Sequence, residues 1–295
     1  MILSVDRVSK RFGATQAVKD VSLNISKGGI TGFLGPNGAG KTTLIRMIMD
    51  IFKPDEGGIT LARDLAGARK DHIGYLPEER GIYTKTPVRE TLRYFAELKG
   101  LSREKAQANT DHFLERLEMT AVAESKIGKL SKGNQQKIQL ISAMVARPDL
   151  LILDEPFSGL DPINVKLVSR LITELRDEGV TIVLSTHQMN QAEAFCEDIF
   201  LFNKGELILQ GALEPIIQKY SGPLMVLDVE GATPENSLFT VLEKDGGSLR
   251  IQLNEGVSQR ELLSWLGQQE FEVRALHPYR VPLSEIFISE VSNHA

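Results

Sequence analysis

The sequence has little cysteine and few aromatic residues: Cys196 is its single cysteine, and aromatic side chains make up 6% of its 295 residues. One cysteine excludes an internal disulfide and any cysteine-rich metal site. A lone thiol of this kind is usually part of the core. Asp6 and Arg7 interrupt the first residues before an apolar segment can form, so no signal peptide is expected. We therefore expect a cytosolic protein that needs no oxidising compartment.

Long hydrophobic runs are also missing. The longest apolar stretches, such as residues 150–153 and 199–202, have the length of a strand. A membrane-spanning helix needs about 18 or more consecutive apolar residues. Any role at a membrane would therefore require a partner.

The chain has no strong excess of charge of either sign. Its formal net charge is −5, with 34 basic and 39 acidic residues, which does not favour a nucleic-acid-binding protein. Residues 1–214 are balanced at 28 basic and 28 acidic, whereas residues 216–295 hold 6 basic and 11 acidic. This shift predicts two units with different roles.

Hydrophobic residues make up 42% of the chain, enough for a globular core. Short buried strands alternate with helical periodicity, which predicts a parallel sheet covered on both faces, with ligands at the carboxyl ends of the strands. The stretches 5–8 and 17–25 predict further, antiparallel strands. Parallel strands are expected at 30–34, 72–76, 150–154, 181–185 and 199–203, and helices at 41–51, 88–98, 103–117, 133–145 and 163–178.

A loop signal at residues 221–223 separates the acidic end of the chain. Beyond it the pattern predicts strands at 224–229, 248–253 and 271–275 and helices at 258–266 and 283–291, with Ser258 as an N-cap. The predicted domains are therefore residues 1–215, with a helical part at about 85–148, and a small accessory α+β domain at 222–295.

The strongest chemical motif fits the pattern G-x-x-x-x-G-K-[ST] and lies between a predicted strand and a predicted helix. Its glycines let backbone N–H groups turn inward around phosphate oxygens, and the following helix directs its positive end at the anion. Lys41 supplies charge to the outer phosphates, and Thr42 offers a hydroxyl to Mg²⁺. The predicted nucleotide-binding residues are Gly35, Pro36, Asn37, Gly38, Ala39, Gly40, Lys41, Thr42 and Thr43.

A second motif follows the apolar strand at 150–153. The end of that strand carries Asp154 towards the Mg²⁺ beside the first motif. Glu155 is one residue further on and faces elsewhere, where it can hold a water in line with the γ-phosphate. An isolated pair of acidic residues after a strand often lies in an ordinary solvated loop. Its occurrence together with the phosphate loop favours a role in nucleotide hydrolysis instead.

Between the two motifs, the segment Leu130-Ser131-Lys132-Gly133-Asn134-Gln135-Gln136-Lys137 resembles the signature sequence of ATP-binding-cassette (ABC) ATPases. The segments 158–161 and 185–187 are similar to the D-loop and switch histidine of that family. The order and spacing match from about residue 2 to residue 215. The resemblance implies a P-loop ABC ATPase fold with a mostly parallel sheet, an antiparallel subdomain and a helical subdomain.

The resemblance also implies roles for individual residues. Phe12, 29 positions before Lys41, takes the place of the aromatic ring that stacks on adenine. Ser131 and Gly133 would bind the γ-phosphate of a nucleotide held by the opposite subunit. His187 would touch the γ-phosphate, and Asp161 would organise the junction between two subunits.

Two positions depart from the family pattern. Glu78 stands where a glutamine usually reaches the Mg²⁺ and the attacking water, and it is predicted to contact the metal with Thr42 and Asp154. Lys132 replaces a glycine of the signature, and we expect it to face solvent. The stretch GYLPEERGIY at 74–83 resembles sodium-extrusion and drug-resistance exporter ATPases, which often carry a C-terminal extension.

The resemblance therefore implies an ATPase that uses ATP and Mg²⁺, with Glu155, His187 and Lys41 as catalytic residues. It would form a homodimer or pseudo-dimer on binding ATP and drive a separate membrane permease that exports ions, drugs or other small molecules. Its expected place is the cytoplasmic face of the cell membrane, through that permease, with no nucleic-acid partner. The alternative is a soluble ABC-type ATPase that regulates a non-transport process. Ribosome-associated ATPases usually carry two cassettes and chromosomal ones long coiled coils, whereas this chain has neither. A P-loop kinase would not need the signature, and a non-enzymatic module is disfavoured by Lys41, Asp154 and Glu155.

Overall fold

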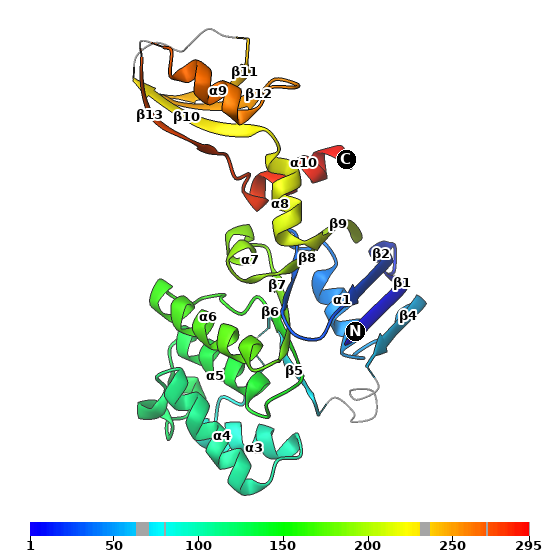
Figure 1. The fold of residues 1–295 in the computed structure, drawn as a ribbon. Helices are drawn as coiled ribbons and strands as arrows, with labels where there is room; N and C mark the ends of the chain where they lie inside the picture. The colour runs from blue at the N-terminus through cyan, green and yellow to red at the C-terminus, as the bar shows by residue number, and fades with distance from the viewer. Residues whose placement is uncertain (63–70, 80, 231–236, 270, 295) are drawn as a thin grey trace. The chain divides into compact units, whose positions relative to one another are not determined.

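A computed structural model describes residues 1–62, 71–79, 81–230, 237–269 and 271–294 (Figure 1). The chain divides into two compact units. One comprises Met1–Leu213 together with the chain end from Glu290, and the other comprises Glu214–Ser289. Within the described ranges, no helix is long and apolar enough to cross a membrane.

A six-stranded sheet forms the centre of the first unit. Its β3, β6 and β7 strands are buried along their whole length, as expected for parallel strands covered on both faces. All neighbours pair in parallel except the last two, which are antiparallel. The order is β5 (Ile73–Leu76), β6 (Leu150–Asp154), β7 (Thr181–Thr186), β3 (Ile30–Leu34), β8 (Asp198–Asn203) and β9 (Glu206–Ala212).

A smaller antiparallel sheet lies at the start of the same unit. It has the order β2 (Thr15–Ile25), β1 (Leu3–Phe12) and β4 (Glu56–Leu61). Helix α1 (Lys41–Ile48) contributes Leu44, Ile45 and Ile48 to a core shared with residues of both sheets. This shared core fixes α1, and the loop before it, relative to the central strands.

The predicted helical part contains α3 (Val88–Leu98), α4 (Arg103–Arg116) and α5 (Lys132–Met144), with two short 3-10 turns at Thr120–Val122 and Ile127–Lys129. Helix α6 (Pro162–Asp177) follows β6, and α7 (Met189–Phe195) follows β7. Asp161 caps α6 by accepting hydrogen bonds from the N–H groups of Ile163 and Asn164, which satisfies two otherwise free donors.

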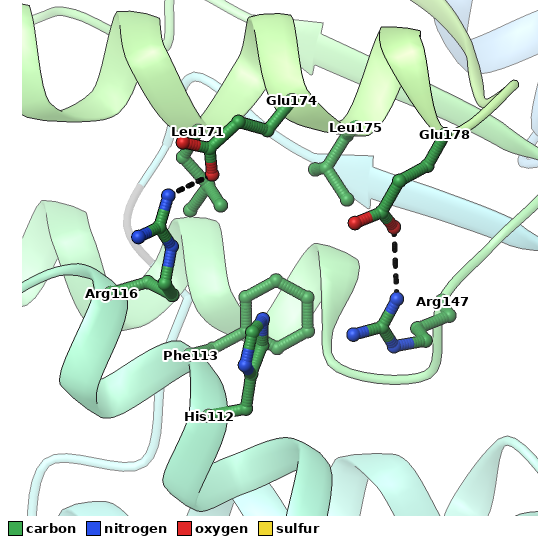
Figure 2. Close-up of a pocket in the computed structure, with 8 residues that line it drawn as sticks. All are labelled: His112, Phe113, Arg116, Arg147, Leu171, Glu174, Leu175 and Glu178. Atoms are coloured by element: carbon green, nitrogen blue, oxygen red, sulfur yellow. Dashed lines mark hydrogen bonds and ion pairs between the residues drawn. The ribbon is translucent and has the colours of Figure 1, made fainter.

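A pocket of about 240 Å³ lies between α4 and α6 (Figure 2). Two ion pairs cross it, one between Arg116 and Glu174 and the other between Arg147 and Glu178 at 2.9 Å. Between them the buried Phe113 ring lies under the Arg147 guanidinium at 5.8 Å. These contacts join the helical part to the helix that follows the Glu155 loop.

The second unit contains a four-stranded antiparallel sheet. Its order is β11 (Phe239–Asp245), β12 (Ser248–Leu253), β10 (Leu224–Glu230) and β13 (Glu272–Pro278). Helix α9 (Gln259–Leu266) covers one face, with Leu262 and Leu266 in a core made with the strands. Ser258 caps α9 in a capping box with Glu261, as the sequence predicts. Helices α8 (Leu213–Ser221) and α10 (Leu283–Asn293) bound this part of the chain.

Most expected elements are present, but the sequence pattern missed β4, β9, β11 and α7. Each of the missed strands is at the edge of its sheet, and Phe239 is the one buried residue among them. Their sequences therefore lack the long apolar run of a strand that is buried on both faces. The expectation for Cys196 is confirmed: it is buried, and burial raises the pKa of its thiol to about 12, so it is unreactive.

Candidate functional site

The loop at residues 35–40 connects β3 to α1 and turns through two glycine positions that no other residue fits. A Cβ on Gly35 would lie 2.2 Å from the carbonyl oxygen of Phe202, and one on Gly40 would lie 2.4 Å from that of Ala17. Both glycines have φ values in the left-handed region, 143° and 101°. No described side chain caps the first turn of α1, so its N–H groups, with those of the loop, form an anion-binding end.

Lys41 begins α1 and folds back over this loop. Its ammonium donates hydrogen bonds to the carbonyl oxygens of Gly35 (2.7 Å) and Pro36 (3.0 Å). Burial lowers the pKa of Lys41, while Glu155, Asp154 and Glu78 act in the opposite direction by charge. The lysine therefore lies close enough to three carboxylates to interact with their charge.

Thr42 and Asp154 meet where α1 begins and β6 ends. The Thr42 hydroxyl donates to Oδ2 of Asp154 at 2.8 Å, and Asp154 is fully buried. Burial raises the pKa of Asp154, opposed first by the nearby hydroxyls of Ser185 and Thr42 and then by the Lys41 charge. Among the described residues, Oδ1 of Asp154 has no hydrogen-bond partner. A hydroxyl beside a carboxylate with an unsatisfied buried oxygen fits Mg²⁺, which takes one or two protein oxygens together with phosphates.

Glu155 follows β6 with a φ of 51°, an uncommon conformation for a residue other than glycine. Its carboxylate is buried and is held by the end of β7. Oε1 accepts from the backbone N–H of His187 at 3.0 Å and lies 2.7 Å from Nδ1 of the same residue, and Oε2 accepts from the Thr186 hydroxyl at 3.3 Å. The imidazole is about half exposed, at 48%. The structure therefore brings the predicted Glu155 and His187 into direct contact.

Phe12 and the signature residues lie on more open surfaces. Phe12 ends β1, is 49% exposed and meets the Phe52 ring edge-on, with 5.5 Å between centroids. Ser131 is exposed and caps α5, accepting from the N–H of Asn134 at 3.3 Å. Gly133 lies in the first turn of α5 and Lys132 is exposed. Within one chain these residues have no contact with the Lys41 loop that the structure records.

Glu78 follows β5 and is exposed, near enough to influence Lys41 by charge.

The residue that holds the Glu78 loop was not predicted from the sequence. Gln139 of α5 is 5% exposed, and its amide donates to the carbonyl oxygens of Pro77 (3.4 Å) and Glu79 (3.1 Å) on either side of Glu78. Gln136, also buried on α5, donates to the carbonyl oxygen of Pro156, next to Glu155, at 3.3 Å. The sequence did contain a signal for these contacts, because Gln136 and Gln139 lie among the apolar residues of α5.

Three features define a P-loop nucleotide-hydrolysing protein: a parallel sheet, a glycine loop closed by a lysine after β3, and an acidic pair at the end of β6, which is separated from β3 by β7. The family model described as "ABC transporter" matches residues 18–158. Together with the 40% identity to a relative that is aligned over 98% of the chain, this match shows that the chain belongs to the ATP-binding subunits of ABC transporters.

Individual relatives agree with this assignment. The chain is 40% identical over 296 residues to "Uncharacterized ABC transporter ATP-binding protein YhaQ" of Bacillus subtilis, with 98% of each chain covered. It is 33% identical to "Lipopolysaccharide export system ATP-binding protein LptB" of Escherichia coli, covering 73% of this chain and 92% of that protein. A solved dimeric structure of the cassette MJ0796 in a post-hydrolysis state, bound to ADP and Pi, is 26% identical. It has a TM-score of 0.65, with 72% of this chain and 99% of that chain covered.

These similarities establish the P-loop ABC fold and ATP hydrolysis as the activity of the family. The alignment with YhaQ covers nearly the whole chain, so it includes the second unit. The alignment with LptB spans about three quarters of it, close to the size of the first unit.

Proposed function

We propose that Lys41, Thr42, Asp154, Glu155 and His187 form the hydrolytic site. The proposal rests on one observation: His187 contacts the Glu155 carboxylate, and that carboxylate is near enough to Lys41 to interact with its charge. The loop and the start of α1 (Gly35, Pro36, Asn37, Gly38, Ala39, Gly40, Lys41, Thr42 and Thr43) enclose the phosphates, and every one of these residues except Pro36 has a backbone N–H that can donate to them. Lys41 stabilises charge on the transferring group. Glu155 orients and polarises the attacking water, and His187 contacts the γ-phosphate.

We propose that Thr42 and Asp154 hold the Mg²⁺ of Mg-ATP, with Glu78 as a further carboxylate. When bound, the metal neutralises charge between the β- and γ-phosphates. Among the described residues no cluster of three or more His, Cys, Asp or Glu is suited to a metal. A site made of one buried carboxylate, a hydroxyl and the nucleotide's own oxygens does not need such a cluster.

Two copies are proposed to enclose ATP head to tail. Ser131 and Gly133 are exposed or half-exposed at the start of α5, where helix N–H groups can bind a γ-phosphate held by another copy. Asp161 lies at the start of α6, one turn beyond the Glu155 loop. ATP then joins the two copies, and phosphate loss separates them.

A membrane permease is the proposed partner of this dimer. An exposed aromatic cluster follows the Glu78 loop: Tyr83 stacks on Phe95 at 6.1 Å and lies 6.3 Å from Tyr94. Tyr83, Tyr94 and Leu98 are each half or more exposed. Because Tyr83 lies five residues after Glu78 and stacks on Phe95 of α3, we propose that an apolar segment of the permease docks here and transmits closure of the dimer to the permease.

Replacing Tyr94 by Arg should weaken this docking about tenfold or more, because it puts a charge into the aromatic cluster. The measurement is the fraction of the chain recovered with membranes that contain a co-expressed permease. Leu263→Arg, which changes an equally exposed side chain in the second unit, is the control. Equal recovery of both variants would contradict the docking site.

We also propose export as the direction of transport and a regulatory or dimer-stabilising role for the second unit. The resemblance to exporter ATPases at 74–83 and the similarity to an ATP-binding protein of an export system support the direction. The acidity of residues 216–295 disfavours direct binding of this unit to anionic lipid.

Ending the chain after Tyr220 tests the proposed role of the second unit. We expect the truncated protein to hydrolyse ATP but to dimerise at several-fold higher protein concentration, measured by light scattering with ATP present. Dimerisation, hydrolysis and transport all at the full-length level would leave the unit without this role.

A further inference from the structure

The end of strand β1 is held by one acidic side chain that the site described above does not use. Strand β1 pairs with β4 only as far as Ser9, which faces Glu56. The residues from Lys10 to Phe12 therefore extend beyond that pairing, and on the other side they form the end of a hairpin with β2, where Phe12 faces Thr15. An exposed hairpin end of this kind is normally the least constrained part of a sheet.

Asp55 binds the end of β1 beyond the last residue that pairs with β4. Its Oδ2 accepts a hydrogen bond from the backbone N–H of Arg11 at 2.7 Å, and its Oδ1 accepts from the Lys10 ammonium at 2.6 Å. Its own N–H donates to the carbonyl oxygen of Ser9 at 2.9 Å. One residue thus contacts each of the three residues that precede Phe12.

The same segment also supports the Phe12 ring. Phe52 meets it edge-on at 89°, and the Lys10 ammonium lies 5.7 Å from the Phe12 ring centre and 5.9 Å from that of Phe52. Such contacts between rings and a cation favour a single ring position. Hydrogen bonds from Lys10 and Arg11 hold the pKa of the Asp55 carboxyl below its usual value, so the carboxylate is charged at neutral pH.

The segment that carries Phe52 and Asp55 begins directly at the end of α1. The N–H of Ile51 donates to the carbonyl oxygen of Arg46, and that of Asp50 donates to Met47, both at 2.9 Å. Helix α1 begins with Lys41. A short, hydrogen-bonded connection therefore links the helix that binds the phosphates to the side chain that holds the end of β1.

We propose that Asp55 is a positioning residue for adenine recognition, which fixes the Phe12 ring at a set distance from the phosphate-binding helix. The inference rests on the proposed stacking of adenine on Phe12. A ring fixed in advance stacks on the base with less loss of conformational freedom than a mobile one. Changing Asp55 should therefore alter the part of the nucleotide affinity that comes from the base. The part that comes from the phosphates should stay the same.

The test compares two probes, ATP and inorganic tripolyphosphate, which has the phosphates without the base. Equilibrium titrations are made on the full chain in EDTA, so that hydrolysis does not proceed. Phe12→Ala should weaken ATP binding about tenfold or more, as expected from loss of stacking on a base. It should leave tripolyphosphate binding within about twofold of the parent, because the phosphate loop is untouched.

Asp55→Ala should weaken ATP binding about three- to tenfold, since it removes two hydrogen bonds to a charged group. Tripolyphosphate binding should again stay within about twofold of the parent. Asp55→Asn keeps an acceptor for Arg11 but loses the charge beside Lys10, so its effect should be smaller. Asp50→Asn is the matched control, because it removes a carboxylate from the same segment that is paired with Lys53 instead. It should bind both probes as the parent does.

Tripolyphosphate also reports whether each variant is folded. The inference is overturned if Asp55→Ala binds ATP as the parent does, or weakens both probes equally, while Phe12→Ala lowers ATP binding alone. If Phe12→Ala itself binds ATP as the parent does, the proposed stacking fails and the inference fails with it.

Discussion

Replacing Glu155 by Gln should lower the rate of ATP hydrolysis by about 10²- to 10⁴-fold, the range expected when a group that activates water is removed. Glutamine has nearly the same size and keeps an oxygen that can accept from the N–H of His187. Lys41, Thr42 and Asp154 do not change, so the affinity for ATP should stay within about threefold. Because the bound ATP is no longer consumed, the variant should accumulate as an ATP-bound dimer.

Phosphate release, ATP titration and light scattering measure the three expected effects separately. Glu178→Gln is a suitable control, since Glu178, directly after α6, forms an exposed ion pair with Arg147, which lies beyond the end of α5. It should hydrolyse ATP at the parental rate. Hydrolysis by Glu155→Gln at nearly the parental rate would show that another group activates the water.

Replacing Lys41 by Ala should remove hydrolysis almost completely, by about 10²-fold or more. The Lys41 ammonium is the cation that faces Glu155, Asp154 and Glu78. Without it, three carboxylates would face the phosphates with no compensating charge. Unlike Glu155→Gln, this change should weaken ATP binding itself, which an equilibrium titration detects. Parental affinity for ATP in this variant would contradict the role given to Lys41.

Ser131→Arg should also be inactive, for a different reason. Ser131 lies at the exposed start of α5 and not at the Lys41 loop of its own chain. An arginine there removes the Ser131 hydroxyl and obstructs only the site that this Ser131 would complete on the opposite copy. Each isolated subunit of this variant should therefore bind ATP as the parent does, while hydrolysis is lost by about 10²-fold.

The sequence predicted the parts of the site that depend on local pattern. The strands that end at Leu34 and Asp154 are apolar and fully buried, and the glycine loop between β3 and α1 has a distinctive spacing. The family resemblance gave Glu155 and His187 separate roles at the γ-phosphate. Their direct contact was not predicted, because it joins the ends of two strands that are distant in sequence.

Asp55 and Gln139 could not be predicted in this way. Asp55 is an ordinary acidic loop residue in sequence, and its importance comes from hydrogen bonds to a strand about 44 positions earlier. Gln139 is an amide in a helix, and its partners lie about 60 positions earlier. Neither sequence pattern nor helix periodicity reports on tertiary contacts of this kind. The exposed edge strands β4, β9 and β11 were missed for a related reason, since their pairing partners set their conformation.

The claim that ATP is enclosed between two copies is tested most directly by mixing the two inactive variants, Lys41→Ala and Ser131→Arg. A mixed dimer has one site with an intact Lys41 from one copy and an intact Ser131 from the other, and a second site in which both are changed. We predict that ATP hydrolysis reappears on mixing and depends on the ratio of the two proteins. If each site were completed within a single chain, the mixture would remain as inactive as either variant alone, and the account would be contradicted.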